Sequence, residues 1–97
     1  MNPVTLEELL PPLREQIGPL SEAIYGINSL NLTSFTREEI TELKQAAMSR
    51  YNFTNEVIGL IREAQSRYNN NELNSFYDSY TDCLRQLQSI ITRLQNI

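Results

Sequence analysis

The stretch that decides the fold is residues 73–97, which read LNSFYDSYTDCLRQLQSIITRLQNI. Its apolar residues recur in alternating steps of three and four, which is the spacing of a coiled-coil heptad seam. This first row comprises Leu73, Phe76, Tyr80, Cys83, Leu87, Ile90, Leu94 and Ile97, and a second row at intervals of seven comprises Tyr77, Leu84 and Ile91. Together the rows cover about three positions in every seven. A helix with so wide an apolar face needs more than one neighbour, which predicts a helical bundle.

A second helix is predicted over residues 37–68. Thr36 and Glu39 have the spacing of a capping box, and Phe35 is placed to pack against Ile40 across the first turn. No proline interrupts this stretch, and it contains a single glycine. One helix of about 32 residues, some 48 Å long, is therefore the simplest interpretation.

Three consecutive asparagines, residues 69–71, follow this long helix. Asparagine favours turns, and its short side chain can cap the next helix. We therefore expect the chain to turn back here, so that a helix over residues 72–96 packs antiparallel against the long helix in a helical hairpin, 37–96. Thr54 and Gln65 interrupt the apolar seam of the long helix and are interpreted as polar residues that fix its alignment.

The first third of the chain is less regular than the rest. A capping-box pattern that begins at Thr5 predicts a short helix over residues 5–10, which Pro11-Pro12 should end or kink. The helical pattern resumes over residues 13–30, where Pro19 predicts a kink or a break.

Together these segments predict an all-α fold in one domain, residues 1–97. The expected architecture is an antiparallel three-helix bundle that consists of a long central helix in the helical hairpin 37–96 and a kinked third helix, with a short extra N-terminal helix.

The charge balance argues against nucleic acid and membrane as partners. The net charge is −4, because 12 acidic residues outnumber 8 lysines and arginines, and these basic residues are scattered among the acids. No apolar run approaches the ~20 residues that span a bilayer, and the N-terminus does not read as a signal peptide. We therefore expect a soluble cytoplasmic protein. Its single cysteine, Cys83, lies on the apolar seam and is interpreted as a small buried hydrophobe, because one cysteine cannot form an internal disulfide.

The residue inventory argues against catalysis. The chain has no histidine, which is the commonest general base and the commonest transition-metal ligand in proteins. Carboxylate pairs such as Glu38/Glu39 and Asp78/Asp82 fall in a helix first turn or opposite the apolar seam, where acids are solvated. We expect no enzymatic activity, no cofactor and no metal site.

Tyrosines near the turn between the last two helices are the first candidate binding site. Tyr68, Tyr77 and Tyr80 cluster there with Phe76, beside the three asparagines. Tyrosine is enriched at protein interfaces because it combines a large apolar area with a hydroxyl group. The alternative is that these rings fill the end of the bundle.

Leucines near the N-terminus are the second candidate. Leu6, Leu9 and Leu10 have the Leu-x-x-Leu-Leu spacing of a short helix that docks into a groove of a partner. The same leucines are also suited to pack against the far end of the long helix, which extends beyond its neighbours.

These features predict a protein-protein interaction module, such as an adaptor or a small subunit of a larger assembly. The long helix carries a second apolar band that one kinked helix is not expected to cover, so we expect self-association, most simply as a homodimer. The band comprises Ala46, Phe53, Val57, Leu60 and Ala64. The alternative is a small inhibitor or chaperone that occludes the surface of one protein partner.

Overall fold

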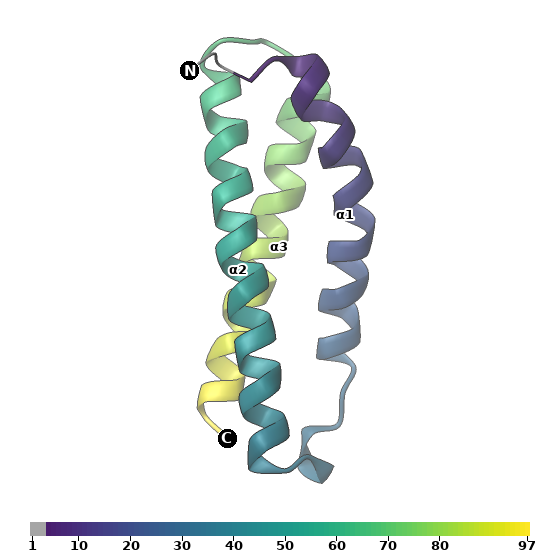
Figure 1. The fold of residues 1–97 in the computed structure, drawn as a ribbon, viewed down its shortest axis with the longest axis vertical. Helices are drawn as coiled ribbons and strands as arrows, with labels where there is room; N and C mark the ends of the chain where they lie inside the picture. Colours follow the sequence, from purple (N-terminus) through teal and green to yellow (C-terminus); the bar gives the residue numbers. More distant parts are fainter. Residues whose placement is uncertain (1–3) are drawn as a thin grey trace.

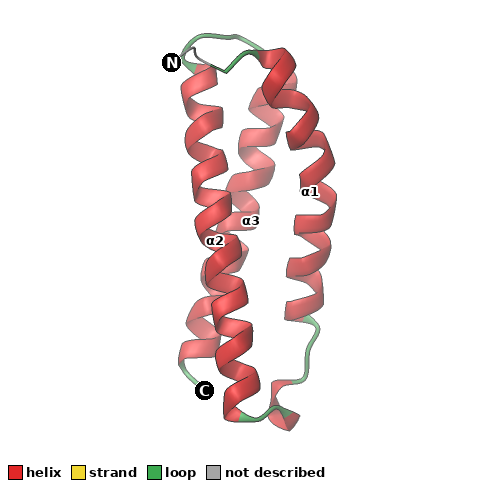
Figure 2. Cartoon of the chain, viewed as in Figure 1, coloured by secondary structure: helices red, strands yellow, loops and turns green. Residues whose placement is uncertain are grey.

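The computed structural model describes residues 4–97, which form three long helices and one short one (Figure 1). The helices are α1 (Leu6–Asn28), the 3₁₀ helix η1 (Leu32–Ser34), α2 (Arg37–Gln65) and α3 (Asn71–Gln95). The long helices run side by side with α1 and α3 antiparallel to α2, and the Cα atoms span 47 × 24 × 17 Å (Figures 1 and 2). The predicted all-α helical bundle is confirmed, and no strand occurs in the described part of the chain.

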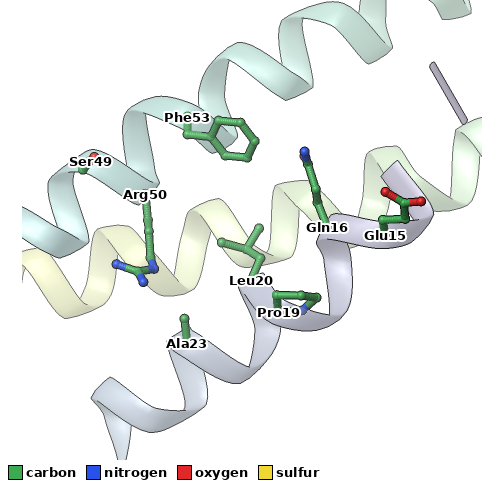
Figure 3. A pocket seen from close by; sticks show the side chains of 8 residues that line it. All are labelled: Glu15, Gln16, Pro19, Leu20, Ala23, Ser49, Arg50 and Phe53. Atoms are coloured by element: carbon green, nitrogen blue, oxygen red, sulfur yellow. The ribbon is translucent and has the colours of Figure 1, made fainter. Parts of the chain in front are cut away.

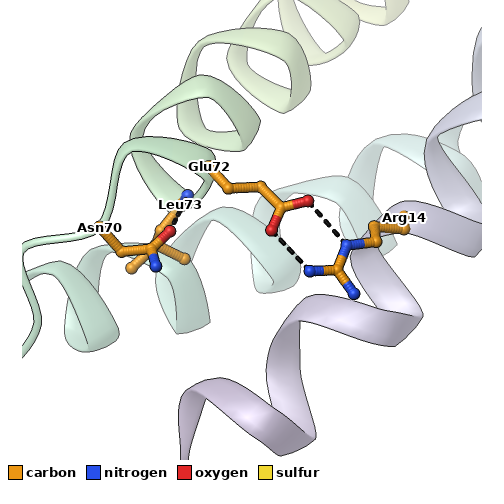
Figure 4. A network of polar contacts seen from close by, with 4 residues as sticks. All are labelled: Arg14, Asn70, Glu72 and Leu73. Carbon is orange, nitrogen blue, oxygen red and sulfur yellow. Dashed lines mark hydrogen bonds and ion pairs between the residues drawn. The ribbon is translucent and has the colours of Figure 1, made fainter.

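The hairpin of α2 and α3 follows the predicted signals closely. The N–H of Thr36 donates to the Glu39 carboxylate at 2.9 Å while the N–H of Glu39 donates to Thr36 Oγ1 at 3.1 Å, a complete capping box. At the start of α3, Asn70 Oδ1 accepts the N–H of Leu73 at 2.8 Å, which is the expected asparagine cap (Figure 4). The long helix ends at Gln65, three residues before its predicted end, because the hydroxyl and N–H of Ser66 satisfy carbonyls of the last turn.

The N-terminal third differs most from the prediction. Residues 6–28 form one continuous helix that contains Pro11, Pro12 and Pro19, so the separate short helix and the break at Pro11-Pro12 are wrong. All three proline rings are exposed, as are Glu7, Glu8 and Glu15, whose carbonyls lose their helical donors. Water can satisfy those carbonyls, while the opposite side of the helix buries leucines and isoleucines that offset the lost hydrogen bonds. The buried residues of α1 are Leu9, Leu10, Leu13, Leu20, Ile24 and Ile27.

The core lies mainly along the seam of α3. Every member of the first apolar row from Leu73 to Leu94 is buried except Phe76, which is half-buried, whereas Ile97 lies beyond the helix and is exposed. The buried apolar residues of all three helices form one cluster. Thr54 is the one buried polar residue in this core, and its hydroxyl donates to the Arg50 carbonyl in its own helix at 2.7 Å. It therefore makes no hydrogen bond across the hairpin, whereas Gln65 does, to Asn74 Oδ1 at 3.0 Å.

Candidate protein-binding groove

Helix α1 packs mainly against α3 and makes little contact with α2. Tyr80 donates its hydroxyl to the carbonyl of Leu13 at 2.9 Å, in the buried core. Near the N-terminal end of α1, the Arg14 guanidinium donates two hydrogen bonds, of 2.7 and 2.6 Å, to the Glu72 carboxylate (Figure 4). Toward the other end Arg93 Nη2 donates to the Asn28 side chain at 3.1 Å. Helix α1 also has far fewer contacts with α2 than with α3, so the seam between α1 and α2 is left open.

Two adjoining hollows follow this open seam. One of about 560 Å³ is lined by residues that include Pro19 and Leu20 of α1 and Phe53 of α2. The other, of about 460 Å³, continues toward Leu30 and Leu43. Ala23 and Arg50 line both hollows, which therefore form one groove along the α1–α2 seam. Figure 3 shows Leu20 and Phe53 between the two helices and Arg50 extending from α2 toward Ala23. We call this feature the α1–α2 groove.

Helix α2 exposes two large apolar side chains on one side, and the first of them, Phe53, lines the groove. Phe53 is 43% exposed and Leu60, seven residues later on the same side of the helix, is 45% exposed. Both belong to the second apolar band of the sequence, and its other large member, Val57, is buried. Isolated exposed apolar residues are common on folded proteins, but apolar side chains beside an apolar groove are typical of binding surfaces.

The α1 wall of the groove includes two small residues. Ala23 and Gly26 line it, and a Cβ atom added to Gly26 would have no atom within 4 Å. Leu20 and Ile27 also line the groove but are almost entirely buried, as is Ile24. The groove is therefore open because α1 offers α2 little to pack against.

The predicted tyrosine site is divided by the structure. Tyr80 is fully buried, so its ring presents no surface to a partner, and burial raises its pKa to about 12. Tyr68 and Tyr77 are half-buried. Tyr68 lines a hollow of about 340 Å³ at the α2–α3 turn, with the Arg67 guanidinium 5.6 Å from its ring centroid, whereas Tyr77 does not line that hollow. The three tyrosines are thus not brought together on one surface.

The predicted leucine site faces the bundle itself. Leu9 and Leu10 are buried in the common core, and Leu6 is half-buried against it. The leucines of the Leu-x-x-Leu-Leu pattern therefore pack against other residues of this chain, where a partner protein cannot bind them without displacing α1.

The single cysteine of the chain is withdrawn from the surface. Cys83 is a free, buried cysteine, as expected, and burial raises the pKa of its thiol, with Ser21 Oγ 3.9 Å from its sulfur. Within residues 4–97 no group of three or more acidic or cysteine side chains is placed to hold a metal ion. None of the helices in the described part of the chain is long and apolar enough to cross a membrane.

Comparison of the chain with protein-family models, with curated proteins and with solved structures found no match.

Proposed function

We propose that this protein is a non-enzymatic interaction module, an adaptor or a small subunit of a larger assembly, that binds a protein partner in the α1–α2 groove. The observation that carries the proposal is the half-exposed Phe53, which lines an apolar groove that the chain leaves unfilled. A helix laid into the groove would act as the fourth helix of the bundle and would bury Phe53. If it continued along α2 it would also cover Leu60, which lies seven residues beyond Phe53.

The geometry of the groove supports a helix as the bound element. From Glu15 to Ile27 the groove follows α1 for about 18 Å, which corresponds to about 12 residues of a facing helix. Ala23 and Gly26 on its α1 wall allow a backbone to approach closely there, and Phe53 on its α2 wall can interdigitate with side chains of the partner.

Photo-crosslinking tests this function. We would replace Phe53 by p-benzoylphenylalanine and, as a matched control, replace Met48 in the same way. Met48 is on another side of α2 and has nearly the same exposure, 45% against 43%. We expect a discrete crosslinked protein from the position-53 probe in extracts of the cells that make this chain, and none from the position-48 probe.

The result that would contradict the proposal is equal crosslinking from both positions, or none from either. The mass of the product also identifies the partner class. A product near twice 11.2 kDa means that a second copy occupies the groove, while any other mass means that a different protein does.

A further inference from the structure

Glutamates lie in heptad register with residues that line the α1–α2 groove on both of its helices. Glu15 lines the groove from α1, and Glu8 and Glu22 lie seven residues before and after it. Ser49 lines the groove from α2, with Glu42 and Glu56 seven residues before and after it. Seven residues are nearly two helical turns, so each trio lies along one side of its helix. All five glutamates are exposed, and within residues 4–97 none of them forms an ion pair.

The α1 edge also presents backbone acceptors. Pro12 and Pro19 have no N–H, so they cannot donate to the carbonyls of Glu8 and Glu15, four residues earlier. Glu8 and Glu15 are exposed residues on the groove side of α1. The α1 edge therefore presents both anionic carboxylates and neutral backbone carbonyls as hydrogen-bond acceptors, and Arg50 is the one cation among the residues that line the two hollows.

We propose that the occupant of the groove is a basic amphipathic helix of another protein, with an apolar stripe flanked on both sides by lysines or arginines. This proposal rests on the proposed function and names its partner class. The apolar stripe would cover Leu20 and Phe53, and the flanking cations would face the glutamates of the two edges. The edge glutamates repeat at about 10.5 Å along α1 and lie about 21 Å apart along α2. The cations of the partner should therefore repeat about every seven residues on the flank that faces α1 and about every fourteen on the flank that faces α2.

A second copy of this chain fits the groove less well. In a two-fold dimer the same surface meets itself, so glutamates of one copy would face glutamates of the other. Like charges in such a contact oppose association. The acidic edges therefore select against self-association through this face and for a partner of opposite charge.

Two matched peptides test the proposal. Each has about three heptads with leucine at positions a and d, and one carries lysine at positions e and g while the other carries glutamate there. Both peptides repel themselves equally, so differences in binding report on the protein. We expect fluorescence anisotropy to show that the full chain binds the lysine peptide at least about tenfold more tightly at low salt, because about five surface charge pairs contribute. The preference should shrink as salt is raised.

Charge variants show whether the edges cause the preference. The edge variant carries Glu15→Gln, Glu22→Gln and Glu56→Gln. The control variant carries Glu7→Gln, Asp78→Asn and Asp82→Asn, which removes the same number of charges from other exposed positions. We expect the edge variant to lose most of the preference and the control variant to keep it. Thermal unfolding followed by circular dichroism shows that each variant is folded.

The possible outcomes separate the two proposals. The basic-helix proposal is overturned if both peptides bind equally well, or if the two charge variants have equal effects. The proposed function still stands in that case if Phe53→Ser abolishes binding while Met48→Ser does not. Binding of neither peptide overturns the basic-helix proposal, and the crosslinking experiment then decides the proposed function independently. If light scattering shows a dimer and Phe53→Ser converts it to a monomer, the groove is occupied by a second copy, and the basic-helix proposal is overturned.

Discussion

The hydroxyl of Tyr80 joins α3 to α1 in the core, and its removal gives the sharpest test of this structure. The ring is fully buried and the hydroxyl donates to the carbonyl of Leu13 at 2.9 Å. Tyr80→Phe deletes one buried hydrogen bond and leaves the ring in place. We expect the free energy of unfolding to fall by about 1 kcal/mol near neutral pH, the usual net worth of such a bond.

The effect of Tyr80→Phe should reverse in alkali. Burial, with a smaller contribution from the Cys83 thiolate, raises the pKa of Tyr80 from 10.0 to about 12. Between pH 10 and pH 12 the folded protein keeps a proton that the unfolded chain has lost, so stability falls as pH rises. The loss is about 1.4 kcal/mol per pH unit and about 2.7 kcal/mol over the window. Below pH 10 both states are protonated and the full stability is present.

Urea unfolding of the wild-type chain and the Tyr80→Phe variant at a series of pH values measures this reversal. Lysines, arginines and the other tyrosines are common to both chains, so the difference in unfolding free energy isolates Tyr80. The wild type should be more stable by about 1 kcal/mol near pH 8, the two should be equal near pH 11, and the variant should be more stable above that. A difference that stays constant from about pH 8 to pH 11.5 would refute the buried, hydrogen-bonded placement of Tyr80.

Three further substitutions test local features of the bundle. Thr36→Ala removes the side-chain acceptor of the capping box and should lower the unfolding free energy by about 1 kcal/mol in a denaturant titration. Thr36→Ser keeps the acceptor and should not lower it, so equal stability of the two variants would contradict the cap. The Arg14 hydrogen bonds lower the pKa of Glu72 below 4.5, so Arg14→Gln should raise it toward that value in a carboxyl NMR titration, and an unchanged pKa would argue against the pair. The hydroxyl of Thr81 is buried with no partner among residues 4–97, so Thr81→Val should leave stability unchanged or raise it by up to about 1 kcal/mol, and a clear loss would mean that the hydroxyl has a partner.

The hairpin could be predicted from sequence because its signals are local and agree with one another. The apolar seam of α3, the capping box at Thr36 and the asparagines before Asn71 each specify an element through nearby residues alone. The end of α2 was missed by three residues because Ser66 closes the last turn, and serine was not among the signals for a helix end.

The continuity of α1 could not be predicted from the same kind of signal. A proline removes one hydrogen bond locally, whereas the burial that offsets this loss depends on a helix packed from elsewhere in the chain. Pro11 and Pro12 lie on the exposed side of α1, and Leu9, Leu10 and Leu13 are buried on the other. The sequence alone shows that these prolines and leucines fall on opposite sides of one helix. That separation is the signal from which a continuous helix could be predicted.

The tyrosine site illustrates the same limit at the level of side chains. The sequence places Tyr77 and Tyr80 near one another on α3. Two residues three positions apart on a wide apolar face can nevertheless be buried to very different extents. Tyr80 is fully buried and Tyr77 is half-buried, because Tyr80 lies on the central row of the face and Tyr77 on its edge. A ring on the central row fills the core, and only an edge position keeps surface for a partner.

The open α1–α2 groove follows from how α1 distributes side-chain size and charge around its axis. Its large apolar residues face the core and its polar bonds reach α3, while its other side offers Pro19, Ala23 and Gly26 to α2. Helix α2 nevertheless presents Phe53 to that side. If the groove served only the stability of this chain, larger side chains at Ala23 and Gly26 would close it, because a Cβ at Gly26 meets no atom within 4 Å. Ala23 and Gly26 on one wall, Phe53 on the other and glutamates in register with both walls are the features on which the proposed binding of a helix from another protein rests.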